Sequence, residues 1–304
     1  MKKVMLIRII LILLLIVFLV APFTFLKPKV NESLSKAPEP KLVAQKPVKV
    51  IVKNVIVKKV IEKPLHNVTL PDFAAIKDIQ SKKKQFFDFI RPTVVKQNNA
   101  LLAIRVKLNK WLEHISLELS LTDQENKELL ALVKQYRVNK NASLLSQLNE
   151  LLVRIDIVPM PLVLVQAANE SAWGTSRFSR IGLNFFGIWC YKPGCGMVPS
   201  SRNTDAKHEV EAFKSLDNAV ARYFLNINSN NAYRVFRTIR LELRSHDEPL
   251  NPEVLATGLL PYSERGADYV IDITKMLRHN KQYLTEDNAE QNTEQNNINE
   301  GEAL

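Results

Sequence analysis

The chain has 304 residues and a formal net charge of +11, which gives room for one sizeable domain plus appendages. The positive excess suits an anionic polymer as a partner, and charge alone does not separate nucleic acid from any other such polymer. The two cysteines and five histidines show no metal-ligand spacing, so they exclude a zinc site, and the sequence implies no metal or organic cofactor.

The N-terminal segment 1–26 is typical of a membrane anchor. Its basic start is followed by an uncharged and almost wholly apolar run over 9–26. This run is near the lower length limit of a membrane span and is long for the apolar region of a signal peptide, which stays open as the alternative. We expect a single-pass anchor in the cytoplasmic (inner) membrane, with the body exported to the periplasm or cell envelope. An exported body meets no nucleic acid.

Two further segments are not expected to form a core. Over 27–71 proline recurs and lysine alternates with valine, which predicts an extended, largely solvated linker between membrane and body. A short edge strand docked on the body is the alternative. The tail 285–304 is rich in Asn, Gln and Glu with little to bury, and we expect it to be disordered.

Segment 72–142 predicts helices that pack on the domain after it. Its apolar residues recur at helical spacing, but Pro92 interrupts them, so we expect a separate amphipathic helix over 93–119. Thr122 begins a capping box for the next helix. A shorter leucine-rich helix follows at 144–152, where the domain predicted for 143–284 begins.

The stretch 159–189 organises the rest of the chain. Prolines at its start suit the first turn of a helix, and 162–168 is apolar on nearly every face, which is typical of a buried helix. Gly174 suits the end of this helix. One carboxylate, that of Glu170, lies near this end, where burial is still substantial.

Two physical effects are expected to act on Glu170 in the same direction. Burial disfavours an ionised carboxylate, and so does the negative end of the helix dipole. Both raise the pKa, which is what a general acid near neutral pH requires. Trp173 could supply an apolar wall one turn on. The alternative is a half-solvated Glu at a frayed helix end, paired with Arg177 or Arg180.

A region punctuated by Gly, Asn and Cys follows. Cys190 and Cys195 enclose a Pro-Gly turn pair, which in an oxidising compartment predicts a disulfide, with reduced thiols as the alternative. Alternation over 209–213 predicts a small β-hairpin between Met197 and Phe213. Four further helices are then expected, beginning after Ser215, at about 232, at Asn251 and at about 266.

The segments ESAWG at 170–174 and NFFGI at 184–188 resemble the signature of the bacterial glucosaminidase domain. This is glycoside hydrolase family 73, also described as mannosyl-glycoprotein endo-β-N-acetylglucosaminidase-like. The resemblance covers roughly 143–280, and the helices before it resemble those of Bax-type proteins within this family.

The resemblance implies a mainly α (α+β), lysozyme-like fold with a small β-hairpin beside the cleft. It implies a β-N-acetylglucosaminidase that cleaves the β-1,4 bond after N-acetylglucosamine in peptidoglycan glycan strands. Glu170 matches the general acid, and Tyr262 falls where the family places a Tyr near the reacting sugar. The remaining predicted substrate-binding residues have core packing or a turn as the alternative; they are Trp173, Asn184, Phe186, Trp189 and Tyr233.

One departure affects the mechanism. Many members of the family carry a second Glu in a T-x-E context, but 198–202 holds no carboxylate. Glu209 and Glu211, on one face of the following strand, are the candidates to replace it, and Asp205 is a weaker candidate. A third possibility is attack by the substrate's own N-acetyl group, which needs no second carboxylate. A lytic transglycosylase and a catalytically weak wall-binding module are the rival functions.

Overall fold

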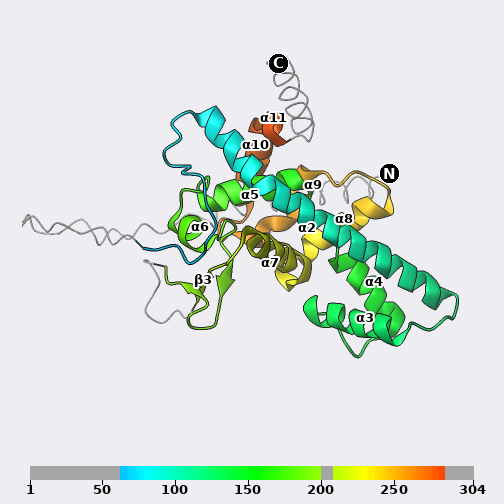
Figure 1. Cartoon of the computed structure of the whole chain (residues 1–304). Helices are drawn as coiled ribbons and strands as arrows, with labels where there is room; N and C mark the ends of the chain where they lie inside the picture. Colours follow the sequence, from blue (N-terminus) through cyan, green and yellow to red (C-terminus); the bar gives the residue numbers. More distant parts are fainter. Residues whose placement is uncertain (1–61, 200–207, 285–304) are drawn as a thin grey trace, which may run out of the picture. The chain divides into compact units, whose positions relative to one another are not determined.

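The computed structural model describes residues 62–199 and 208–284, which lie in one compact unit of the chain (Figure 1). The expected anchor, most of the expected linker and the expected tail lie outside these residues. Within them, no helix has the length and apolar character needed to span a membrane. The described part is mainly helical with one small antiparallel sheet, as predicted.

The helices and strands follow one another from Ile79 to Leu284. The α-helices are α2 (Ile79–Ser116), α3 (Asp123–Gln135), α4 (Leu144–Arg154), α5 (Met160–Ser171), α6 (Arg177–Gly182), α7 (Leu216–Ser229), α8 (Arg234–Ser245), α9 (Pro252–Ala256), α10 (Ala267–His279) and α11 (Lys281–Leu284). Short 3-10 helices are η2 (Asn231–Tyr233) and η3 (Thr257–Tyr262), and the strands are β1 (Trp189–Cys190), β2 (Gly196–Met197) and β3 (Glu209–Glu211).

The prediction that Pro92 separates two helices is wrong. Helix α2 runs through Pro92 as one element of 38 residues, and Asp78 caps its start by accepting a hydrogen bond from the Ser81 amide. Proline costs a helix one hydrogen bond and a steric clash. Here the apolar stripe continues in phase on both sides of it, from Phe86 to Trp111, and burial of that stripe outweighs the local cost.

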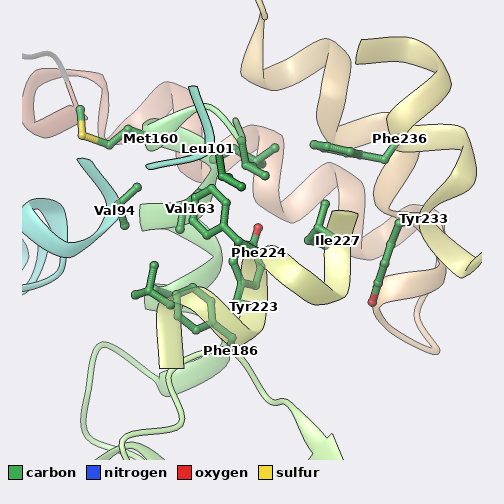
Figure 2. Packing of buried hydrophobic residues seen from close by; sticks show 14 of the residues in the cluster. Val94, Leu101, Met160, Val163, Phe186, Tyr223, Phe224, Ile227, Tyr233 and Phe236 are labelled. Atoms are coloured by element: carbon green, nitrogen blue, oxygen red, sulfur yellow. The ribbon is translucent and has the colours of Figure 1, made fainter. Parts of the chain in front are cut away.

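Helix α5 is buried, as its all-round apolar sequence predicts. Helices α2, α9, α10 and α11 contact it, and the side chains of 162–165 are fully buried. Figure 2 shows how Val163 of α5 lies in one cluster with side chains from α2, α7 and α8. The helix is therefore held on all sides, and the direction in which its last turn points is fixed by the core.

Asp156, in the turn before α5, is a buried anchor that the sequence did not indicate. Its carboxylate is 2% exposed and lies near Arg244 and Arg105, at N–O distances of 3.0 and 3.5 Å. Arg240 donates to four backbone carbonyls within 153–157. Because a buried carboxylate is stable only when paired and hydrogen-bonded, this cluster fixes where α5 begins.

The sheet has three strands where the sequence predicts a hairpin. Strands β2 and β3 form the expected antiparallel pair, with Met197 opposite Val210. Strand β1 pairs with the other edge of β3, with Trp189 opposite Val210, giving the order β1-β3-β2. A two-residue strand carries no alternation signal, which is why the sequence did not show β1.

Residues 62–70, the end of the predicted linker, are tied to the body without forming a strand. The Leu65 amide donates to the Ile181 carbonyl (2.8 Å), and Nε2 of His66 bonds the Arg180 carbonyl (3.0 Å). Glu62 forms an ion pair with Arg177. This segment is thus mostly exposed but fixed along α6.

Candidate active site

Glu170 lies in the wall of a cavity of about 760 Å³. The other walls come from the loop before β1, from β1 itself, from α7, η2 and the segment 261–265, and from Arg137 in the turn after α3. These parts are distant in sequence, so the cavity exists only in the folded chain. Its volume is within the range of pockets that take small ligands.

The end of α5 presents Glu170 to this cavity. The helix ends at Ser171, and Ala172, not Gly174 as expected, is the left-handed cap (φ 50°). The Trp173 amide donates to the Ala168 carbonyl (2.8 Å), which closes the last turn. Three successive residues with positive φ, 172–174, then turn the chain sharply away from the carboxylate.

The environment of Glu170 favours its neutral form. Burial raises the pKa of its carboxyl above the ordinary value of 4.5. Three weaker effects oppose this shift: a hydrogen bond from the Asn169 side-chain amide to Oε1 (3.1 Å), the hydroxyl of Tyr269, and the positive charge of Arg265.

Glu170 is not paired in the way the alternative for a frayed helix end requires. Arg177 pairs with Glu62, and Nε of Arg180 donates to the Thr175 carbonyl at 3.1 Å. Among the described residues, neither guanidinium forms an ion pair with Glu170. The carboxyl therefore keeps its raised pKa.

A chain of buried hydrogen bonds runs beneath Glu170. The Tyr223 hydroxyl donates to Oε1 of Gln166 (2.5 Å), so the amide nitrogen of Gln166 is the donor to the Tyr269 hydroxyl oxygen (2.9 Å). This leaves the hydroxyl hydrogen of Tyr269 for the carboxylate of Glu170. The sequence did not indicate this chain, because its members lie on α7, α5 and α10.

Four of the predicted aromatic residues line the cavity. The Tyr262 hydroxyl donates to the Phe186 carbonyl (2.7 Å), and its ring stacks on Tyr269 with centroids 5.4 Å apart. Burial raises the pKa of Tyr233 to about 12, so it stays protonated and able to donate. Trp189 is 46% exposed, and one face of its indole stacks on the His208 ring with centroids 4.0 Å apart, which leaves only the opposite face for another ring.

Two predicted substrate-binding residues do not line the cavity. Trp173 packs edge-on against Phe86 and Phe87, with centroids 5.7 and 5.3 Å away. The buried side chain of Asn184 donates to the Ile188 and Glu211 carbonyls and accepts from two amides of its own turn. The structure thus shows Trp173 packed against the aromatic core and Asn184 holding a turn.

The loop 190–195 is closed by a disulfide between Cys190 and Cys195. The carboxylate of Glu209 lies against this loop and accepts hydrogen bonds from the Gly194 and Gly196 amides, both at 2.9 Å. The two sulfurs and this carboxylate come within 4.8 Å of one another, but sulfurs bonded to each other are not thiolate metal ligands.

The carboxylates predicted to assist Glu170 lie elsewhere. Glu209 is engaged by the loop, Glu211 bonds Nε of Arg222 (3.1 Å), and neither lines the cavity. Asp205 lies outside the described residues. Glu264, which the sequence did not single out, lines the cavity with Glu170, and these two are its only carboxylates among the described residues.

Comparison with known proteins identifies the family of the chain. The family described as glucosaminidase, mannosyl-glycoprotein endo-beta-N-acetylglucosaminidase, matches residues 146–283. The chain belongs to this family and is a glycoside hydrolase, which confirms the resemblance seen in the sequence. It is similar to Protein bax of Escherichia coli (strain K12), with 30% identity over 217 residues, which is 71% of this chain and 76% of that protein. No solved structure matches significantly.

Proposed function

We propose that the protein is a peptidoglycan hydrolase that cleaves the β-1,4 bond after N-acetylglucosamine, with Glu170 as the general acid. The observation that carries this is a carboxyl of raised pKa, at the end of a rigid buried helix, opening into a cavity lined by aromatic side chains. A protonated carboxyl beside sugar-binding surfaces is what glycosidic bond cleavage needs.

In the first step, Glu170 gives its proton to the glycosidic oxygen as the bond to the anomeric carbon breaks. The leaving sugar departs as a neutral alcohol, and positive charge develops on the ring that stays behind. The ionised carboxylate of Glu170 then stabilises this charge. The hydroxyl of Tyr269 donates to that carboxylate and keeps it in place.

The second step adds water to the anomeric carbon. Glu264 is the cavity carboxylate available to take the proton of this water, since Glu209 and Glu211 are engaged outside the cavity. Trp189 stacks on the sugar ring with the indole face that His208 does not cover, and Tyr233 and Tyr262 border the reacting unit. Glu264 is exposed at the wall of the cavity, so water can reach its carboxylate.

A lytic transglycosylase is the second candidate. One observation favours it: of the cavity carboxylates in the described part of the chain, Glu170 alone is shielded from solvent, and transglycosylases work with a single acid. In that reaction a hydroxyl of the muramic acid itself attacks the anomeric carbon, and an anhydro end replaces the reducing end. Product masses separate the two reactions.

The test is digestion of purified sacculi by the full chain and by four Glu→Gln variants, with mass spectrometry of the released fragments. Glu170→Gln is expected to lose about a thousandfold in rate and Glu264→Gln about a hundredfold. Glu209→Gln and Glu211→Gln are the matched controls for chemistry and should keep most of kcat, because neither carboxylate lines the cavity. Full activity in Glu170→Gln would refute the proposal, and anhydro ends would favour the second candidate.

We further propose that segment 1–26 anchors the protein in the inner membrane, with the catalytic body in the periplasm. The apolar run over 9–26 supports the anchor, and the Cys190–Cys195 disulfide suits an oxidising compartment. Protease added to spheroplasts should degrade the body of the intact chain. Protection of the body in this experiment would contradict the orientation.

A further inference from the structure

Arg137 is a cavity residue that comes from outside the segment matched by the family, 146–283. It follows α3 in a left-handed conformation (φ 58°), and the next amide, of Val138, donates to the Val133 carbonyl (2.9 Å). Tyr136 and Val138 are buried on either side of it. The turn is therefore locked, and it presents the exposed side chain of Arg137 at the wall of the cavity.

Helix α7 and its C-cap residue face the same cavity with a polar row at a spacing of four residues: Arg222, Asn226 and the C-cap Asn230 all line it. Arg222 uses Nε to bond Glu211, and its terminal nitrogens have no hydrogen-bond partner among the described residues. The Asn230 amide donates to Oδ1 of Asn226 (3.2 Å), which keeps the two amides in line. These side chains are hydrogen-bond donors whose positions are fixed by the helix.

Two of the three arginines that line the cavity form ion pairs within the described part of the chain, and the third does not. Arg222 is paired with Glu211, and Arg265 is paired with Asp272. Arg137 is the cavity cation that forms no ion pair among the described residues. Arg137 therefore brings to the cavity wall a positive charge that no ion pair among the described residues neutralises.

We propose that Arg137 and Arg222, with the amides of Asn226 and Asn230, form a subsite for a carboxylate of the glycan substrate. This rests on the proposed function, because peptidoglycan carries carboxylates on its stem peptides and, where a stem peptide is absent, on the lactyl group of muramic acid. Guanidinium groups bind carboxylates in planar, two-bonded geometry. The subsite selects an acidic glycan over a neutral one of the same backbone.

The experiment compares Arg137→Gln with wild type in the full chain on three substrates. These are glycan strands with stem peptides, strands freed of peptide so that the lactyl carboxylate is exposed, and strands whose carboxylates have been converted to methylamides. Lys134→Gln is the matched control, since Lys134 is exposed at the end of the same helix but does not line the cavity.

Arg137→Gln should lower kcat/KM roughly tenfold on the acidic strands and leave it unchanged on the methylamides. Arg137→Lys should recover part of the loss, and added salt should slow wild type but not Arg137→Gln. The strand type that shows the loss identifies which carboxylate binds. Equal losses on acidic and neutral strands, or no loss on either, would overturn the subsite. Activity that survives Glu170→Gln would instead refute the proposed function.

Discussion

Gly187 lies directly against the carboxylate of Glu170: a β-carbon built on Gly187 would come within 3.3 Å of Oε2. Gly187 also has a left-handed backbone (φ 64°), which costs a residue with a side chain about 1–2 kcal/mol. Gly187→Ala should therefore destabilise the protein by about that amount and also lower kcat, because the added methyl displaces the acid. Thermal unfolding and single-turnover kinetics measure the two effects.

Gly194→Ala is the control for this prediction. Gly194 has the same left-handed backbone (φ 79°), but a β-carbon there meets nothing within 4 Å. Its substitution should cost similar stability and leave kcat unchanged. If the two variants lost kcat equally, contact with Glu170 would not be the cause.

Glu170 should make the stability of the protein depend on pH. Its pKa is raised in the folded state, so the folded chain holds this proton more tightly than the unfolded chain, whose value is near 4.5. The free energy of unfolding therefore falls as pH rises from below about 4.5 through the folded pKa. Glu170→Gln cannot ionise and should escape this loss.

The difference in Tm between Glu170→Gln and wild type should consequently be small near pH 4 and positive near pH 7. Thermal unfolding of both proteins across this range measures it. A difference that did not change with pH would contradict the raised pKa.

Tyr269→Phe should move the pH profile of activity upward. The Tyr269 hydroxyl is one of the groups that lower the pKa of Glu170, against the larger effect of burial. Without it the pKa rises further, so the acid stays protonated to higher pH. The alkaline limb of kcat/KM should shift to higher pH, together with a lower kcat because the carboxylate loses a donor.

Tyr283→Phe is the comparison, since Tyr283 packs near Phe87 and does not line the cavity. Its alkaline limb should coincide with that of wild type. A shift of the Tyr269→Phe limb to lower pH would mean that the hydroxyl does not donate to Glu170.

Glu209→Ala should affect binding more than chemistry. It removes the acceptor of the Gly194 and Gly196 amides and costs about 1–3 kcal/mol if both are left unsatisfied. The loop carries Tyr191 at the cavity and follows directly on Trp189 of β1, so KM should rise while kcat changes little. Glu113→Ala, on the exposed face of α2, should change neither. A large loss of kcat with unchanged KM would instead make Glu209 a catalytic group.

Local sequence signals gave good predictions wherever the structure depends on neighbours along the chain. The capping box at Thr122 is present as expected, and α5 is buried as its apolar sequence requires. Pro92 shows the limit of such signals. Proline inside a helix has a local energetic cost, but burial of the apolar stripe of α2 against distant segments outweighs this cost, and the helix continues. Trp173 shows the same limit, because no local signal distinguishes an aromatic ring that stacks on a sugar from one that packs on Phe86.

The sequence by itself determined the family, the largely helical fold and the position of Glu170 at the end of a buried helix. Spacing along one helix and a motif on one stretch of chain are local properties, so they can be recognised in the sequence. Only the tertiary structure decided that Glu209 serves the disulfide loop, that Glu264 and Arg137 reach the cavity, and that Tyr269 lies against the acid. Those relationships join residues far apart in the chain, and the packing of α2, α5, α7 and α10 brings them together.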